Sequence, residues 1–312
     1  MTAWRIVCDA GGTNVRYARA DETGNVSDVI TLTSSLSLED ALQNYAARFS
    51  DTSQLNGVAV AAAGPIENGC VRLTNRDLDI SVASLSRALE GRPAVLLNDL
   101  EAAAWSLPVL DTTQLGSILW PTEALSGPRL VVNVGTGFGG AILVQVRGGW
   151  HVIACEPGHM TFVPRQADGL IATVEDAISG LTLSDPVRLK TYWNLPLDHL
   201  DFAREPLFAP RKPPEEVEQG LHRRADLQKF HEAFSAALGQ VCGDLVLACG
   251  AWGGVYLCGS VASAWHAAGQ FDEFQAAFED KGPMTPRMRR VSVSMITHGN
   301  PVLIGLTQVP LR

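Results

Sequence analysis

Apolar runs separated by glycine are the first pattern that the chain shows. Residues 4–8 are mostly apolar and lead into Ala10-Gly11-Gly12-Thr13, after which residues 15–20 continue in an extended pattern. Two such runs on either side of a glycine turn are typical of a β-hairpin. The N-terminal segment therefore predicts two antiparallel strands joined by this turn.

A second stretch repeats this layout further along the chain. Residues 130–134 form an apolar run, Gly135-Thr136-Gly137-Phe138-Gly139-Gly140 provide the turn, and residues 141–144 are apolar again. We interpret the two hairpins as a weak internal repeat, which is carried by pattern more than by identity.

Helices are indicated between the apolar runs. Leu38, Leu42, Tyr45 and Phe49 recur at three- and four-residue spacing, and Ser37 is placed to cap that helix. Further helices are expected at residues 83–89, 102–107, 226–249, 271–278 and 301–306, further strands at 58–62, 94–97, 255–258 and 291–296, and a proline-rich surface loop at 204–220. Alternating strands and helices predict an α/β protein, and the hairpins imply mixed sheets.

Length, composition and charge indicate the number of domains and the kinds of partner that the protein could bind. The 312 residues suggest two domains, and 46% hydrophobic residues are enough for large cores. The formal charge of −9 argues against nucleic acid or an anionic membrane as the main partner. A phosphorylated ligand is still compatible with this charge, because backbone N–H groups bind phosphate without lysine.

The cysteines indicate a reducing compartment. The six cysteines contain no C-x-x-C pair, and most lie in apolar runs, which predicts reduced, buried thiols and no zinc site. We find no apolar stretch of about 18 residues that would cross a membrane. The first residues also lack the pattern of a signal peptide. These features fit a reducing cytoplasm.

Three glycine-rich turns each follow a short apolar strand, and glycine allows close approach to phosphate. They are Gly11-Gly12-Thr13, Gly135-Thr136-Gly137 and Gly253-Gly254 leading to Gly259. Any one of them is also compatible with a simple tight hairpin. The P-loop is excluded because it requires a lysine directly after glycine, and none of Lys190, Lys212, Lys229 and Lys281 follows one.

A dinucleotide-binding site is the second kind of nucleotide site that the glycines could form. Gly135, Gly137 and Gly140 match G-x-G-x-x-G, with Glu156 near the expected acidic position. That motif must open a helix. The residues after Gly140 are instead rich in β-branched side chains and are broken by Gly148-Gly149, so we disfavour a dinucleotide-binding oxidoreductase. The pattern fits the actin-like ATPase fold, in which hairpin turns hold the phosphates.

Two aspartates follow predicted strands. Asp9 would lie near the phosphates and could hold Mg²⁺ through water, although capping of the turn explains an aspartate there equally well. Asp99 follows the apolar run at residues 94–97 and suits a general base that accepts a proton from a hydroxyl group. A helix N-cap is the alternative role for Asp99.

The order and spacing of several short motifs resemble the proteobacterial-type glucokinases over nearly the whole chain. The matching segments are residues 9–16 (DAGGTNVR), 73–77 (LTNRD), Asn98-Asp99, 135–139 (GTGFG), 156–159 (EPGH), Glu175 with Ser179-Gly180, and 278–282 (FEDKG). Each motif is modest by itself, and together they are specific. The related repressor/kinase group carries a cysteine-rich zinc motif that this chain lacks.

The resemblance implies phosphorylation of glucose at its 6-hydroxyl by ATP with Mg²⁺. It also implies a two-domain actin-like (ribonuclease H-like) fold, with residues 1–108 and 298–312 in a small domain and 109–297 in a large one. The sugar would lie in the interdomain cleft, and the protein would be a homodimer. By residue match, Asp99 is the base, the sugar contacts are Asn75, Asn98, Asp99, Glu156, His159 and Glu175, and the nucleotide contacts are Asp9, Gly11, Gly12, Thr13, Asn14, Thr136, Gly137 and Gly259.

Three positions depart from the family pattern. Leu78 stands where tryptophan is common and could alter hexose preference, Pro157 replaces a glycine and stiffens its loop, and Ser260 replaces a glycine in the expected adenosine-side turn. Two alternatives therefore stay open. One is a kinase for another hexose, such as mannose, fructose or an amino sugar, and the other is a sugar- and nucleotide-binding sensor without activity.

Overall fold

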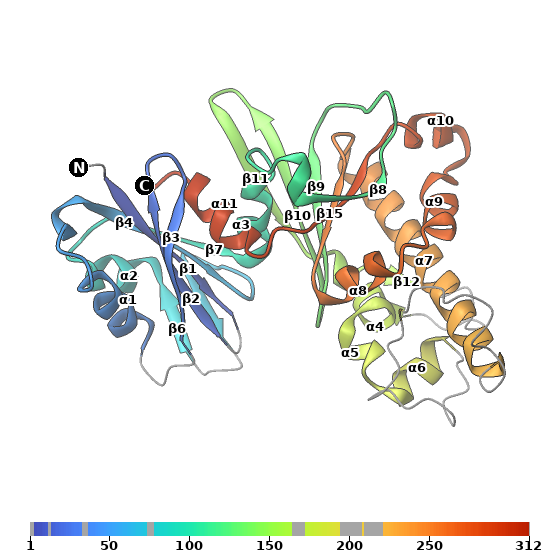
Figure 1. Cartoon of the computed structure of the whole chain (residues 1–312), viewed down its shortest axis with the longest axis horizontal. Helices are drawn as coiled ribbons and strands as arrows, with labels where there is room; N and C mark the ends of the chain where they lie inside the picture. Colours follow the sequence, from blue (N-terminus) through green and yellow to red (C-terminus); the bar gives the residue numbers. More distant parts are fainter. Residues whose placement is uncertain are drawn as a thin grey trace. The chain divides into compact units, whose positions relative to one another are not determined.

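The chain folds into two compact units. The computed structural model describes residues 3–11, 14–32, 37–73, 78–163, 172–193, 208 and 221–311. The first unit comprises Met1–Leu110, Trp150–Ala154 and His298–Arg312, and the second comprises Asp111–Gly149 and Cys155–Thr297 (Figure 1). Nothing in the sequence pattern indicated that Trp150–Ala154 groups with the first unit.

A five-stranded mixed sheet forms the centre of the first unit, in the order β3-β2-β1-β4-β7. Strand β1 pairs antiparallel with β2 and parallel with β4, and β7 is parallel to β4. Strands β5 and β6 form a separate hairpin. The elements are β1 (Trp4–Ala10), β2 (Val15–Asp21), β3 (Val26–Leu32), α1 (Leu38–Ala46), η1 (Thr52–Gln54), β4 (Leu55–Ala62), β5 (Cys70–Leu73), β6 (Leu78–Ser81), α2 (Val82–Ala88), β7 (Ala94–Asn98), α3 (Asp99–Ser106) and α11 (Pro301–Gln308).

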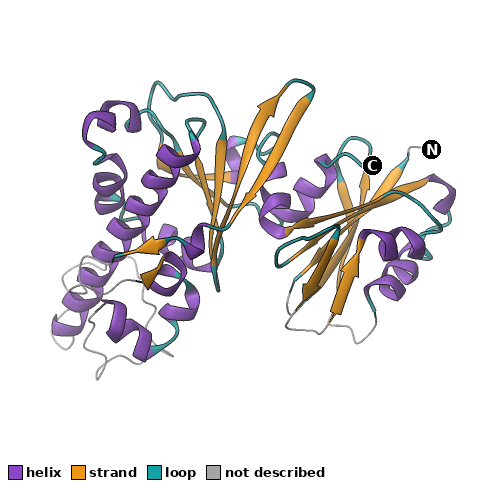
Figure 2. Cartoon of the chain, turned by 180° about the vertical axis from the view of Figure 1, so that it is seen from behind, coloured by secondary structure: helices purple, strands orange, loops and turns teal. Residues whose placement is uncertain are grey.

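Helices cover both faces of this sheet because its strands are apolar on both sides (Figure 2). Successive residues of a strand point to opposite faces. On β1, Ile6 and Cys8 pack with α1 and α2, whereas Val7 packs with α3 and α11. The second face is built largely of small residues, namely Ala18, Ala20, Ala59 and Ala61. Their size allows α3 and α11 to approach the sheet closely.

The second unit is built on a six-stranded mixed sheet, in the order β11-β10-β9-β14-β15-β8. Strand β14 is parallel to both β9 and β15, whereas β10 and β8 are antiparallel to their partners. The elements are η2 (Thr112–Gln114), β8 (Leu115–Leu119), β9 (Arg129–Val134), β10 (Phe138–Val146), β11 (Gly149–Cys155), η3 (Pro157–His159), β12 (Thr161–Phe162), β13 (Ala172–Thr173), α4 (Val174–Ile178), α5 (Gly180–Leu183), α6 (Pro186–Trp193), α7 (Leu221–Cys249), β14 (Val255–Cys258), α8 (Ser260–Ala268), α9 (Asp272–Glu279), η6 (Gly282–Met284), α10 (Thr285–Met288) and β15 (Val293–Ile296).

The long helix α7 lies in the core of the second unit. Phe230, Phe234, Leu238 and Val241 are buried in one cluster with residues of the sheet. The part Leu227–Cys249 is long and apolar enough to cross a membrane, but 56% of the window tested is buried inside the fold. Within the described residues it is the one helix that passes this test, and its burial makes it weak support for a span.

The internal repeat extends beyond the two hairpins. In the first sheet, the meander β1-β2-β3 is followed by the parallel strands β4 and β7, and in the second, β9-β10-β11 is followed by β14 and β15. The two central sheets therefore share one layout, and the expected mixed α/β architecture is confirmed.

Several predicted boundaries were wrong, since α3 begins at Asp99 rather than at residue 102 and α1 ends at Ala46, before Phe49. Two more concern the glycine turn and α7. Gly139 and Gly140 belong to β10 rather than to the turn, and they pair with Asn133 and Val132 of β9. A Cβ at Gly140 would lie 3.0 Å from the carbonyl oxygen of Val131, so this glycine serves close packing rather than turning.

The other boundary concerns α7, which begins at Leu221 instead of Asp226. The expected loop at residues 204–220 lies outside the described residues except for Phe208. That residue is buried, and its ring packs against Phe230 and Phe234.

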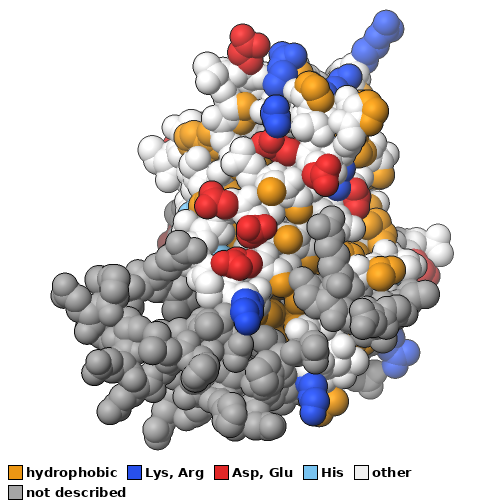
Figure 3. Space-filling view, turned by 90° about the vertical axis from the view of Figure 1, so that its right-hand side faces the viewer, with side chains coloured by type: hydrophobic (Ala, Val, Ile, Leu, Met, Phe, Trp, Pro, Cys, Tyr) orange, Lys and Arg blue, Asp and Glu red, His pale blue; other side chains and the backbone are white. Residues whose placement is uncertain are grey.

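The six cysteines are all free thiols, as expected, but their burial varies. Cys8, Cys242 and Cys258 are buried, whereas Cys70 is exposed. On the face shown in Figure 3, carboxylates gather near the middle, and Lys and Arg side chains lie above and below them.

Candidate active site

The carboxyl ends of three parallel strands meet at one edge of the first unit's sheet. Ala10 of β1 lies beside Ala62 of β4, which lies beside Asn98 of β7. Asp9 and Asp99 are thereby brought to the same edge of the sheet, with β4 between their strands and Asp99 two residues beyond the register position of Asp9. In open α/β sheets, ligands bind outside the carboxyl ends of the strands.

Asp9 is largely shielded from solvent and forms an ion pair with Arg16, which is more exposed. Its side chain is 16% exposed, and its Oδ2 accepts a hydrogen bond from Nη1 of Arg16 at 3.1 Å. Burial raises the pKa of the Asp9 carboxyl, and the charge and hydrogen bond of Arg16 offset only part of that rise. The ionised carboxylate is therefore costly in the folded state, and a bound cation would relieve this cost.

We expect the variant Asp9→Asn to unfold at a temperature at least as high as the parent protein at pH 8. A carboxyl whose pKa is raised by folding contributes stability below its unfolded pKa, and this is lost as pH rises through the folded pKa. The amide side chain of the variant carries no charge, so its burial avoids this cost. Arg16 is 41% exposed, so its guanidinium stays solvated without the carboxylate partner. Thermal unfolding between pH 2 and pH 8 tests this.

Asp21→Asn is the control with the opposite sign. Hydrogen bonds from the Thr23 hydroxyl and then from Asn25 and the Thr23 backbone lower the pKa of Asp21 to about 2. Its stabilising effect should be present above the unfolded pKa and disappear as pH falls toward 2.

A clear loss of stability in Asp9→Asn at pH 8 would contradict the prediction for Asp9. It would show that the ion pair with Arg16 stabilises the fold by more than the burial of the Asp9 carboxylate destabilises it.

Asn98, rather than Asp99, caps helix α3. Its Oδ1 accepts a hydrogen bond from the Leu100 N–H at 2.8 Å, and Oε2 of Glu101 accepts one from the Asn98 N–H at 2.9 Å, which completes a capping box. Nδ2 of Asn98 donates to the Gly64 carbonyl at 3.0 Å. The capping role considered for Asp99 thus belongs to its neighbour. Asp99 is the half-buried first residue of the helix, and its Oδ1 accepts from the Leu100 N–H at 3.0 Å.

In the second unit, residues 135–137 form the glycine turn between β9 and β10, and each of their carbonyl groups accepts a hydrogen bond. The Gly135 carbonyl accepts from the Gly180 N–H at 2.7 Å, that of Thr136 from the Leu181 N–H at 3.0 Å, and that of Gly137 from the Gly135 N–H at 3.0 Å. Within the described part of the chain, the N–H groups of Thr136 and Gly137 have no hydrogen-bond partner.

Peptide planarity directs these two N–H groups. In a trans peptide, the C=O and the following N–H point in opposite directions. The carbonyls of Gly135 and Thr136 point at the start of α5, so the N–H groups of Thr136 and Gly137 point away from it. Together with the hydroxyl of the exposed Thr136, they supply donors suited to an anion.

Strand β14 brings a second glycine beside this turn. Cys258 at its end lies opposite Asn133 of β9. Gly259 has a φ of 99°, and a Cβ there would lie 2.5 Å from the Val134 carbonyl oxygen, so only glycine fits. The exposed Ser260 opens α8 directly after it.

Glu156 and His159 lie at the two ends of η3, and both are exposed. A Cβ at Gly158 would lie 2.2 Å from the Phe138 carbonyl oxygen, so η3 rests on the first residue of β10. Pro157 is buried at the start of η3, where its fixed φ suits a helical turn. The loop that carries Glu156 and His159 is thus anchored next to the glycine turn.

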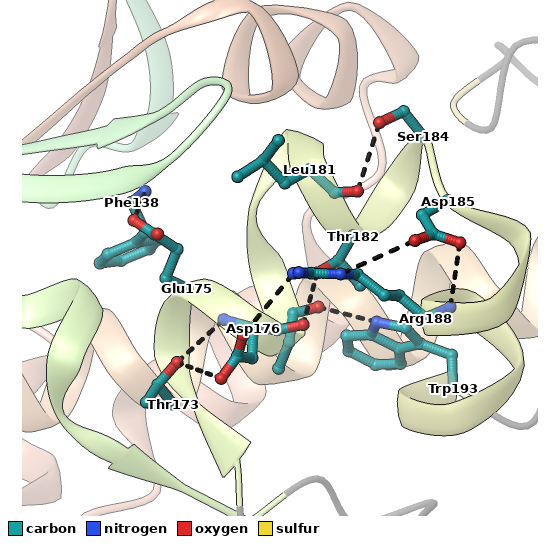
Figure 4. Close-up of polar contacts among 11 residues, drawn as sticks. Phe138, Thr173, Glu175, Asp176, Leu181, Thr182, Ser184, Asp185, Arg188 and Trp193 are labelled. Carbon is teal, nitrogen blue, oxygen red and sulfur yellow. Dashed lines mark hydrogen bonds and ion pairs between the residues drawn. The ribbon is translucent and has the colours of Figure 1, made fainter. Parts of the chain in front are cut away.

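Glu175 lies on α4, also beside the glycine turn (Figure 4). Its Oε2 accepts a hydrogen bond from the Phe138 N–H at 3.1 Å.

The candidate residues divide between the two units. Asp9, Gly11, Asn14, Asn98 and Asp99 belong to the first, and Thr136, Gly137, Glu156, His159, Glu175 and Gly259 to the second. Gly12, Thr13 and Asn75 lie outside the described residues, and Leu78 opens β6.

Three contacts that shape the site were not predicted, although Arg16 and Gly180 lie in motifs that match the family. Arg16 pairs with Asp9, Glu101 closes the cap of α3, and Gly180 binds the glycine turn. The N-x-x-E spacing of Asn98 and Glu101 was a readable capping signal. The other two contacts depend on strand register and on tertiary packing, which leave no local signal.

The relatives of this chain share nearly its full length. A sequence model of the glucokinase family matches residues 6–311. A glucokinase of Nitrobacter hamburgensis is 33% identical over 328 residues, which cover 100% of this chain and 98% of that protein. One of Chromobacterium violaceum is 32% identical over 318 residues, covering 97% of this chain and 88% of that protein. The chain belongs to the glucokinase family.

Solved structures agree with the glucokinase fold. This glucokinase-family chain is similar to a glucokinase from an Antarctic psychrotroph, with a TM-score of 0.81 and 25% identity over 99% of this chain and 98% of that one. The family resemblance and the actin-like fold predicted from the hairpins are therefore confirmed.

Proposed function

We propose that this glucokinase-family protein transfers the γ-phosphoryl group of ATP to the 6-hydroxyl of glucose. The observation that carries the proposal is that proton-accepting carboxylates and phosphate-binding N–H groups lie on different units. Carboxylates lie at the strand ends of the first unit, and the glycine turn of the second unit holds two N–H groups that have no hydrogen-bond partner among the described residues. Phosphoryl transfer requires both a proton acceptor and donors for phosphate oxygens.

Asp99 serves as the general base in this proposal. Its carboxylate accepts the proton of the sugar hydroxyl as that oxygen forms a bond to the γ-phosphorus. The bond between this phosphorus and the β–γ bridging oxygen breaks, and ADP leaves with the electron pair. The N–H groups of Thr136 and Gly137 donate to phosphate oxygens and position the nucleotide.

Asp9 fits a site for Mg²⁺. Magnesium binds through one or two carboxylates together with water and substrate phosphates. Asp9 supplies one buried carboxylate that is costly when ionised, and within the described residues there is no group of three or more His, Cys, Asp or Glu that could hold a metal without help. When bound, the ion would neutralise phosphate charge.

Coupled measurement of ATP consumption over a panel of hexoses tests the function. We expect glucose to give the highest kcat/KM among glucose, mannose, fructose and glucosamine. A higher kcat/KM for another hexose would assign the protein to that sugar. Sugar and nucleotide binding without turnover would assign it as a sensor and contradict the proposal.

The two units would then be the two domains of the kinase. Its compartment would be the cytoplasm, where ATP is available. The homodimer that the resemblance implies stays a prediction. Analytical ultracentrifugation with and without glucose tests it.

A further inference from the structure

Glu175 contacts the backbone of the nucleotide-binding turn. Its Oε2 accepts a hydrogen bond from the Phe138 N–H at 3.1 Å, and the same oxygen lies 2.8 Å from where a Cβ at Gly137 would be. The carboxylate is half-buried and packs directly on the C-terminal side of the turn (Figure 4). The family resemblance assigns Glu175 to the sugar, and this contact is on the nucleotide side.

The contact holds one of the three peptide units of the turn. The unit between Gly137 and Phe138 has its carbonyl bound by the Gly135 N–H and its N–H bound by Glu175. The two preceding units are fixed by the start of α5, as described above. With Glu175 in place, every peptide unit of the turn is fixed, and the two outward N–H groups have defined directions.

Helix α4, which carries Glu175, is itself fixed at both ends. Oγ1 of Thr173 accepts from the Asp176 N–H at 3.0 Å and caps the helix start. Nε1 of the buried Trp193 donates to the Ala177 carbonyl at 2.8 Å near the helix end. Arg188 lies 3.6 Å from a carboxylate oxygen of Asp176. These contacts, visible in Figure 4, restrict rotation of α4 and hold Glu175 against the turn.

A carboxylate at this place has two opposing effects on phosphate binding. Its charge repels a phosphate group bound at the neighbouring N–H donors. Its oxygen also makes a charge-assisted hydrogen bond, which is roughly twice as strong as a neutral one and holds the turn in shape. The contact and the charge can therefore be separated by substitution.

We propose that Glu175 is a positioning residue for the nucleotide. It holds the 135–137 turn so that the N–H groups of Thr136 and Gly137 face the phosphates. This proposal rests on the proposed function only in taking the ligand of the turn to be a nucleotide.

Binding of ADP measured by calorimetry in the absence of sugar tests this role directly. Glu175→Asp keeps the charge but is one methylene too short for the contact, and we expect its Kd to rise roughly tenfold, as for the loss of one charge-assisted hydrogen bond. Glu175→Gln keeps an oxygen that accepts from the Phe138 N–H and removes the repulsion. Its Kd should stay within about threefold of the parent value or fall below it.

Glu273→Gln is the matched control, because Glu273 is an exposed glutamate in the first turn of α9. It should leave the Kd unchanged. Steady-state kinetics add a second measure, in which KM for ATP should follow the Kd of each variant. Far-ultraviolet circular dichroism establishes that both Glu175 variants are folded.

An unchanged ADP Kd in Glu175→Asp, with a rise confined to KM for glucose, would overturn the proposal. The same holds if Glu175→Gln binds ADP as weakly as Glu175→Asp, because an oxygen that still accepts from the Phe138 N–H would then not preserve binding. A parent protein that binds ADP but phosphorylates no hexose would contradict the proposed function and leave the role of Glu175 supported.

Discussion

Asp99→Asn should lower kcat for glucose phosphorylation by about 10²- to 10⁴-fold, the usual contribution of a general base. The change removes the basic carboxylate and keeps an oxygen that can accept from the Leu100 N–H. The start of α3 should also be unaffected, because Asn98 and Glu101 form the cap. Glucose affinity, measured by calorimetry, should change only a few-fold.

Asp272→Asn is a matched control, because Asp272 is the exposed first residue of α9, the same helix position that Asp99 has in α3. Any general effect of removing a carboxylate from a helix N-terminus would affect both variants. We expect turnover to be unchanged in the control. Turnover close to the parent value in Asp99→Asn would refute its assignment as the base.

Gly305→Ala should destabilise the first unit by at least about 3 kcal/mol, at the upper end of overpacking effects. Gly305 is buried on α11, and a Cβ there would lie 1.6 Å from the Ala102 carbonyl oxygen of α3 and 3.0 Å from the Ser106 nitrogen. Backbone atoms cannot move aside as a flexible side chain can, so the two helices would have to separate. Because α3 begins at Asp99, activity should fall as well.

Gly299→Ala provides the comparison for this variant. Gly299 precedes α11, is exposed, and a Cβ there would meet no atom within 4 Å. Chemical unfolding of both variants measures the difference in free energy. If Gly305→Ala unfolds at the same denaturant concentration as Gly299→Ala, α3 and α11 are less tightly packed than described here.

The sequence predicted those features that have a local cause. The hairpins could be predicted from glycine between apolar runs, and the cap of α1 from Ser37, whose hydroxyl accepts from the Asp40 N–H. The start of α7 was missed because residues 221–226 are largely polar and basic and give no apolar period. Helices α4 and α5 were missed because five and four residues are too few for a period to be detected.

The candidate residues were predicted from motifs, whereas their contacts came from packing. The bond between Glu175 and Phe138 joins residues 37 positions apart. The register of β1 and β2 places Arg16 opposite Asp9, and the apolar pattern of the sequence does not determine this register. The cap of α3 is different, because the spacing of Asn98 and Glu101 is a local signal, and the sequence analysis considered Asp99 for the cap although Asn98 provides it.

The central sheets of the two units share one layout, in which a three-stranded meander is followed by two parallel strands. The residues carried by these two frameworks differ, because Asp99 lies at a strand end of the first unit, whereas the outward N–H groups of Thr136 and Gly137 lie in the turn of the second. A protein made of two copies of one unit would lack either Asp99 or the N–H donors of Thr136 and Gly137. Neither half is therefore expected to retain catalytic activity when expressed as an isolated fragment.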